Sequence, residues 1–214
     1  MATCAPVWLF DLDNTLHDAS LHIMPHIHRG MNEYLAATLG MTTDEAAQLR
    51  RVYWQRYGTT LAGMMRHHGT DPHHFLQETH RFPELRSMLV FDRQVKAMLR
   101  RLPGRKIIFS NAPRRYALAV LELMGIRVLF DAVYAIEQLR FRSKPDIRGF
   151  LRLIKAERLV PSRCIMVEDS PANLKTAKLL GMKTVLVSRA AKLPTWVDLR
   201  LQSVLELPRQ LGRL

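Results

Sequence analysis

The 214-residue sequence is poor in cysteine and lacks long apolar runs, and both shortages exclude classes of protein. Cys4 and Cys164 are too few for a disulfide framework and have no metal-site spacing, so we expect two free thiols. No apolar run reaches the roughly 18 residues that cross a bilayer, which argues against a membrane protein. The residues before Asp11 lack the basic segment of a secretory signal, so we expect a soluble, cytoplasmic protein.

Acidic residues are also scarce, since 19 Asp and Glu face 32 Lys and Arg and leave a formal net charge of +13. Such an excess attracts anionic partners over long range. The basic residues are scattered and form neither a basic block nor an RNA-binding signature. This distribution argues against nucleic acid as a partner and favours a small anionic substrate.

Short apolar runs alternate with helical patterns over much of the chain. Buried parallel strands are predicted at 7–10, 107–109, 164–167 and 185–187, and helices at 114–124 and 171–180. Each of these two helices ends at a glycine, Gly125 or Gly181. The alternation predicts a doubly wound, mostly parallel α/β sheet of the Rossmann-like kind, with ligands beyond the carboxyl ends of its strands.

The long stretch between the first two strands contains no strand pattern and is too long for a loop. Its helical patterns cover 23–39, 43–57, 60–68 and 72–81, and a further helix at 92–102 leads back to the sheet. We therefore predict a small helical cap inserted after the first strand. Its predicted limits are 17–90, with the α/β core formed by 1–16 and 91–214.

Pairs of acidic residues follow two of the predicted strands. Asp11 and Asp13 come after the first strand, where residues two apart point to the same side, and Glu168 and Asp169 end the third run. Two like charges in one pocket repel each other unless a cation lies between them or one group holds a proton for transfer. Turn capping could explain the first pair alone, but the second pair supplies further oxygen ligands of the kind that Mg²⁺ prefers.

Two other segments place polar groups at the same edge. Ser110 and Asn111 end the second strand and lead into a helix, where a hydroxyl and backbone N–H groups can hold phosphate oxygens, although helix capping explains them as well. Lys144 precedes a helix that Pro145 is expected to start, a position where its ammonium can act as a point charge for a phosphoryl group.

These four segments, FDLDNT, FSNA, SKPD and VEDS, resemble in order and spacing the motifs of the haloacid dehalogenase-like hydrolase superfamily. The resemblance runs from Val7 to about Leu207. It implies that Asp11 is a nucleophile, Asp13 a general acid and base, Ser110 and Asn111 phosphate-binding residues, and Lys144 a charge neutraliser.

The resemblance also implies a magnesium site made of Asp11, the carbonyl of Asp13, and Asp169. Glu168 is either a further ligand or an acceptor for a metal-bound water, and the sequence leaves both open. Within the superfamily, the second aspartate of the first motif is typical of the phosphatases. We therefore expect a Mg²⁺-dependent hydrolase of small phosphate monoesters that works through an aspartyl-phosphate.

The first 90 residues resemble the pyrimidine 5'-nucleotidase group, chiefly in DNTLH and in YGTTLAG. The likeness implies that the substrate is a nucleoside monophosphate, UMP or CMP, and marks Asn14, Tyr57, Thr59 and Thr60 as candidate substrate or cap residues. A helix end followed by a threonine cap explains the YGTT segment equally well. The sequence departs from the group at His17, where tyrosine is usual, and at residues 80–82.

Two other functions fit part of the pattern. The catalytic motifs do not separate a nucleotidase from a phosphatase for a sugar phosphate or phosphoglycolate. A non-catalytic, basic binding module would keep the fold and use its charge, but the presence of every catalytic residue argues against it. The sequence leaves the oligomeric state open.

Overall fold

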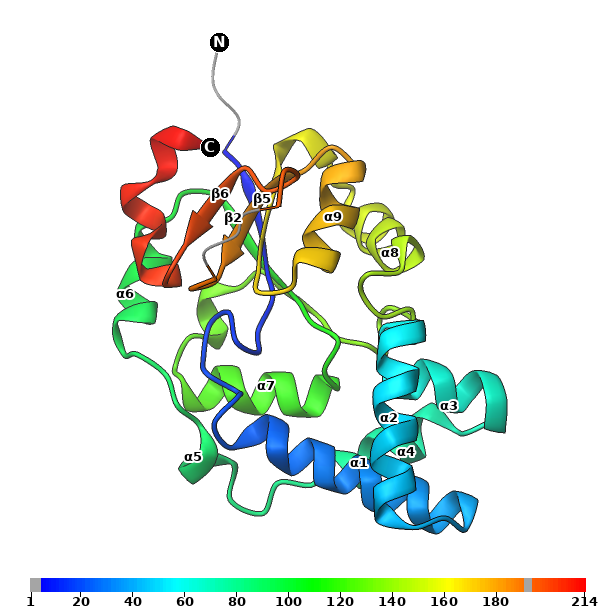
Figure 1. The fold of residues 1–214 in the computed structure, drawn as a ribbon. Coiled ribbons are helices and arrows are strands. Elements are labelled where there is room, and N and C mark those ends of the chain that lie inside the picture. The colour runs from blue at the N-terminus through cyan, green and yellow to red at the C-terminus, as the bar shows by residue number, and fades with distance from the viewer. Residues whose placement is uncertain (1–4, 191–193) are drawn as a thin grey trace.

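The computed structural model describes residues 5–190 and 194–214, so Cys4 lies outside it (Figure 1). Within these residues the centre is a six-stranded, wholly parallel sheet of order β3-β2-β1-β4-β5-β6. The strands are β1 Val7–Phe10, β2 Arg105–Phe109, β3 Ala132–Tyr134, β4 Cys164–Glu168, β5 Lys183–Val187 and β6 Leu199–Leu201. The predicted α/β fold is confirmed, and the two edge strands, of three residues each, are additions to the four predicted.

The nine α-helices of the described residues all fall between β1 and β5 along the chain. They are α1 Ile23–Leu39, α2 Thr43–Tyr57, α3 Thr60–His68, α4 Pro72–Thr79, α5 Leu85–Met88, α6 Gln94–Arg101, α7 Arg114–Leu123, α8 Ile147–Glu157 and α9 Pro171–Leu179. Short 3₁₀ helices occupy Arg127–Leu129, Pro161–Arg163, Val204–Arg209 and Leu211–Arg213. None of the helices in the described ranges is long and apolar enough to cross a membrane.

Alternating side chains of β1 hold the layers together. Trp8 and Phe10 belong to an apolar cluster with residues of α6, α7 and the 3₁₀ helix Val204–Arg209, whereas Leu9 belongs to a second cluster with residues of α8 and α9. Trp8, Leu9 and Phe10 are all fully buried. A parallel strand covered by helices on both faces accounts for the uninterrupted apolar run seen in the sequence.

Register places the ends of the central strands level with one another. Phe10 pairs with Ile108 on one side and with Val167 on the other, and the amide of Asp11 continues the ladder to the carbonyl of Val167 at 3.0 Å. The polar residues that follow β1, β2 and β4 therefore meet at one edge of the sheet.

Helices α1–α4 group together beyond that edge (Figure 1) and pack around their own apolar cluster, which includes Leu35, Met64 and Phe75. Ile136, from the loop after β3, belongs to the same cluster, and Phe141 packs against it. Asp18 donates its amide to the carbonyl of Val90 at 2.8 Å, which ties the outgoing chain to the returning one. The limits of 17–90 for the cap stay a prediction.

Candidate active site

Three charged side chains from separate segments meet at the carboxyl edge of the sheet. Lys144, from the loop before α8, donates from Nζ to Asp11 Oδ1 and to Glu168 Oε2, each at 2.7 Å. Lys144 and Glu168 are each 1% exposed and Asp11 is 7% exposed. These buried pairs join three of the four predicted motifs at one point.

The balance of charge at this point is negative. Burial raises the pKa of Asp11 to about 7, with Glu168 and Asp13 adding to the rise and Lys144 opposing it. Burial likewise raises the pKa of Glu168 to about 7 and moves that of Asp169 upward. Burial would lower the pKa of Lys144, but the two carboxylates outweigh it and the net shift is upward. One lysine therefore faces three carboxyl groups.

The acidic residues are suited to a divalent cation. Asp11, Glu168 and Asp169 each offer an oxygen within 4.8 Å of the others. Hard carboxylate oxygens that are crowded and buried fit Mg²⁺, which would favour the charged forms that burial disfavours. The residues present fit the predicted metal.

The carboxylate of Asp13 contacts Tyr116 and His17. Its Oδ1 accepts a hydrogen bond from the hydroxyl of Tyr116 at 2.5 Å and lies 2.9 Å from Nε2 of His17, which donates to it in the Nε2–H tautomer. This arrangement is compatible with the expected metal contact through the Asp13 carbonyl, because the side chain is engaged elsewhere. Sequence reasoning missed Tyr116, which falls within the helix predicted at 114–124, and noted His17 only as a departure from a related group.

Ser110 and Asn111 make different contacts. Asn111 donates from Nδ2 to the carbonyl of Lys144 at 2.9 Å and accepts from the Lys144 amide at 2.7 Å, so both ends of its side-chain amide hold the lysine backbone. Ser110 Oγ accepts from the amide of Ala112 at 3.0 Å, and among the described residues its hydroxyl proton has no protein acceptor. The Ser110 hydroxyl is thus available to a phosphate oxygen, while Asn111 positions Lys144.

The YGTT segment of the cap contacts the loop before α8 that carries Lys144, here called the lysine loop. The contact is made by Gly58 and Thr59. Thr59 caps α3 by accepting from the amide of Ala62 at 3.2 Å, and its Oγ1 lies 3.3 Å from Ser143 Oγ. Thr60 is 4% exposed and directs its hydroxyl to the carbonyl of Arg50 at 3.5 Å. Both hydroxyls therefore have partners within the protein.

The other two candidate cap residues are also engaged. The hydroxyl of Tyr57 lies 2.6 Å from Nε2 of His67, and both side chains belong to the cap. Asn14 has a positive φ of 59° and accepts at Oδ1 from the amide of Ala19 and the hydroxyl of Ser20. Asn14 thereby shapes the turn that leads from the sheet into the cap.

Aromatic rings gather beside Asp13. The ring centroid of Phe82 lies 5.1 Å from that of Tyr116, and the ring centroid of His80 lies 6.2 Å from that of Tyr116. Burial lowers the pKa of His80 to about 4, so its imidazole is neutral. His26, on α1, lies 5.0 Å from Phe82. The segment 80–82, noted in the sequence only as a departure, is thus close to the predicted general acid.

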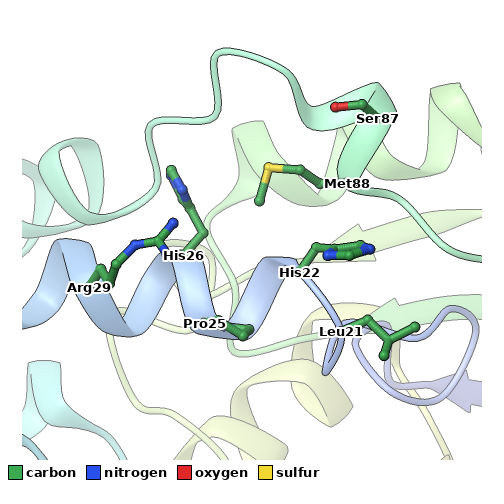
Figure 2. A pocket seen from close by; sticks show the side chains of 7 residues that line it. All are labelled: Leu21, His22, Pro25, His26, Arg29, Ser87 and Met88. Carbon is green, nitrogen blue, oxygen red and sulfur yellow. The ribbon is translucent and has the colours of Figure 1, made fainter.

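Two surface cavities flank this region. The first, of about 410 Å³, lies between α1 and α5, and Figure 2 shows the side chains that line it, among them His26 on α1 and Met88 on α5. The second, of about 620 Å³, adjoins the acidic cluster at Asp169 and is also lined by Asn14 and Arg189. The first cavity is lined by His26, which contacts the aromatic group, and the second is lined by Asp169 of the acidic cluster.

Comparison with known proteins gives relatives of this architecture. Over 199 residues the chain is 26% identical to phosphate metabolism protein 8 of Saccharomyces cerevisiae, covering 84% of this chain and 60% of the yeast protein. It is 32% identical over 75 residues to a validoxylamine A 7'-phosphate phosphatase of Streptomyces hygroscopicus subsp. limoneus, covering 35% of each. The chain thus spans less than two thirds of the length of both curated relatives.

Solved structures match the fold over nearly the whole chain. A HAD phosphatase from Thermococcus onnurineus superimposes with a TM-score of 0.68 at 22% identity, covering 97% of this chain and 98% of that one. CbbY from Rhodobacter sphaeroides, in complex with phosphate, gives a TM-score of 0.69 at 20% identity, covering 95% and 96%. At these identities the likeness is one of fold.

The family model for haloacid dehalogenase-like hydrolases matches residues 7–181. That range includes Asp11, Asn111, Lys144 and Glu168, which hydrogen bonds join at the carboxyl edge of the sheet. The chain belongs to the haloacid dehalogenase-like hydrolase family.

Proposed function

We propose that the chain is a phosphomonoester hydrolase that forms an aspartyl-phosphate on Asp11. The strongest support is the buried contact between Lys144 Nζ and Asp11 Oδ1 at 2.7 Å. Ser110, which follows the neighbouring strand β2, has a hydroxyl that is available to bind phosphate. A nucleophile needs its charge held in place, and a phosphoryl group needs cations around its oxygens. The same few residues can meet both needs.

In the proposed mechanism, a carboxylate oxygen of Asp11 attacks phosphorus while the bond to the leaving oxygen breaks. Asp13 gives its proton to that oxygen, which departs as an alcohol. Asp13, now a carboxylate, then takes a proton from water, whose oxygen attacks phosphorus and releases phosphate and the Asp11 carboxylate. Lys144 and Ser110 hold the phosphoryl oxygens throughout.

Asp11, Asp169 and the Asp13 carbonyl would hold Mg²⁺, and Glu168 lies close enough to join them directly or to act through a bound water. When bound, Mg²⁺ would supply positive charge that favours the carboxylate form of Asp11 and balances the charge of the phosphoryl group.

Replacing the nucleophile tests this proposal without knowledge of the natural substrate. Asp11→Asn should abolish Mg²⁺-dependent release of phosphate from p-nitrophenyl phosphate and prevent acid-stable labelling of the protein by phosphate. Asp44→Asn makes the same chemical change at an exposed position in the first turn of α2 and should have no effect. Full activity of the Asp11 variant would contradict the proposal.

For the substrate, we propose a pyrimidine nucleoside monophosphate, UMP or CMP. The resemblance of the first 90 residues supports this choice, and so do the rings of Phe82, His80 and Tyr116 beside Asp13. The leaving group must lie on the Asp13 side of phosphorus, where flat aromatic faces favour a planar ring. These rings are better placed for that contact than Thr60, whose hydroxyl is directed into the cap.

A substrate panel separates this proposal from its alternatives. UMP and CMP should give a higher kcat/KM than AMP, GMP, glucose 6-phosphate or phosphoglycolate. Phe82→Leu should lower kcat/KM for UMP about tenfold, a loss typical of one stacking contact, and spare glycerol phosphate. Replacing Thr59 and Thr60 with valine tests the YGTT segment in the same way. A preference for sugar phosphates or phosphoglycolate would replace the nucleotide assignment and leave the phosphatase intact.

A further inference from the structure

Both hydrogen bonds of the Asp13 carboxylate fall on one of its two oxygens. The hydroxyl of Tyr116 donates to Oδ1 from α7 of the core, and Nε2 of His17 faces the same oxygen from the start of the cap segment. No protein donor reaches Oδ2 among the residues that the structure describes. Because the side chain of Asp13 is 14% exposed, its free oxygen is not sealed from a substrate.

His17 is held in this place although one of its nitrogens has no partner. Its side chain is fully buried, and Nδ1 makes no hydrogen bond in the described structure. Burying an unpaired polar atom destabilises a fold, and an apolar side chain of similar size would avoid that loss. The contact between Nε2 and Asp13 Oδ1 is the hydrogen bond that a histidine makes here and an apolar side chain would lose.

The two donors come from opposite sides of the junction between core and cap. His17 forms an isolated bridge with Asp13, and the next residue, Asp18, bridges to Val90 where the cap chain returns. Tyr116 is 3% exposed and fixed in the core. The orientation of Asp13 therefore depends on one buried residue of the core and on one residue at the junction with the cap.

We propose that Tyr116 and His17 are positioning residues for proton transfer, because by occupying Oδ1 they reserve Oδ2 of Asp13 for the leaving oxygen and later for water. This inference rests on the proposed function, in which Asp13 is the general acid and base. With His17 in the Nε2–H tautomer, Oδ1 accepts two hydrogen bonds and the transferable proton belongs on Oδ2. Neither residue touches the reacting atoms, so both act through Asp13.

Leaving groups of different basicity provide the test. A p-nitrophenolate departs with little help from an acid, whereas an alkoxide must be protonated as it leaves. In single-turnover experiments, Tyr116→Phe should slow phosphorylation of Asp11 by an alkyl phosphate about ten- to hundredfold. The rate with p-nitrophenyl phosphate should change by less than about threefold, and KM by about twofold or less.

Tyr134→Phe is the matched control, because it removes a tyrosine hydroxyl that binds Glu157 Oε1 at 2.8 Å on another element. It should leave both rates unchanged. An equal loss with both substrates in Tyr116→Phe, or no loss with either, would overturn the inference. Loss of activity in Asp11→Asn and Asp13→Asn together with a normal Tyr116→Phe would reject this inference alone and leave the proposed function standing.

Substitution of His17 supplies an independent readout. His17→Leu should slow phosphorylation by the alkyl phosphate selectively while its melting temperature equals or exceeds that of the wild type, because the unpaired Nδ1 is gone. His17→Gln, whose amide can donate to Asp13, should recover part of the rate. A lower melting temperature in His17→Leu with equal loss on both substrates would mean that His17 is only structural.

Discussion

At the scale of single residues, the candidate active site depends on side chains that hold the backbone around Lys144. Asn111 was predicted to bind phosphate, yet both ends of its amide contact the backbone of Lys144. Thr176, on α9, donates to the carbonyl of the neighbouring Pro145 at 2.9 Å. The position of the Lys144 ammonium therefore follows from hydrogen bonds made by its own backbone and by the next residue.

We expect Asn111→Ala to release that backbone. Two hydrogen bonds in a partly buried place are lost, so unfolding free energy should fall by about 1–3 kcal/mol, and kcat/KM on an aryl phosphate should fall about tenfold or more. Asn32→Ala is the control, because it removes the side-chain acceptor of a hydrogen bond from Arg50 within the cap. The control should lose stability without losing activity. Unchanged activity in Asn111→Ala would show that Lys144 needs no such support.

At the scale of elements, the junction between α2 and α3 is where the cap meets the lysine loop. Gly58 ends α2 with a φ of +82°, and a Cβ placed on it would lie 3.1 Å from Cδ of Pro145 and 3.6 Å from the carbonyl of Lys144. Only glycine combines this backbone conformation with so close an approach. The cap thus rests directly on the segment that carries Lys144.

Gly58→Ala should therefore disturb both folding and catalysis. The positive φ alone destabilises an alanine by about 1–2 kcal/mol, and the contact with Pro145 should shift the lysine loop and lower kcat. Gly40→Ala separates the two effects, because Gly40 has a φ of +65° at the end of α1 but nothing within 4 Å of the added Cβ. Thermal unfolding and steady-state kinetics of both variants give the comparison. Equal kcat values would mean that the junction does not influence the site.

Much of the fold could be predicted because its elements carry local signals. The central strands are continuous apolar runs buried on both faces, and helices such as α2 begin with a capping box between Thr42 and Glu45 and end at Gly58. Strands β3 and β6 have three residues each, and their apolar runs are too short to predict a strand from the sequence. Their pairing comes from neighbouring strands, so the sequence alone does not reveal it.

The site could be predicted in part for a related reason. Motifs give residues that lie next to strand ends, such as Asp11 and Glu168. They do not give contacts made across a large separation in sequence, such as Tyr116 with Asp13, which are 103 residues apart. Such partners follow from helix packing and become visible only when the chain is folded.

At the scale of the whole molecule, we expect stability and Mg²⁺ binding to be linked through the buried carboxyl groups. The pKa values of Asp11 and Glu168 rise to about 7 from ordinary values near 4. Without metal, the folded chain therefore binds more protons than the unfolded chain between about pH 4 and pH 7. Their contribution to stability is fully present below that window and is lost as the pH rises through about 7.

Mg²⁺ should reverse this loss, since it binds the ionised carboxylates. We expect Mg²⁺ to raise the melting temperature more at pH 8 than at pH 5, where protons compete for the same oxygens. Thermal melts in Mg²⁺ and in EDTA, at matched ionic strength, measure the difference. Asp169→Asn should remove most of the Mg²⁺ effect at pH 8. The same rise at both pH values, or none at either, would contradict the assignment of the site.

Ile136 belongs to the apolar cluster of the cap and Phe141 packs against it, although both residues follow β3 of the α/β core in the chain. They sit in the loop that continues to Lys144, so the cap and this loop form one exchangeable unit. In a chimaera that replaced only residues 17–90 with the cap of another family member, the new cap would pack against a loop whose side chains fit the original cap. Engineering of new specificities on this scaffold would therefore have to transplant residues 136–142 together with the cap.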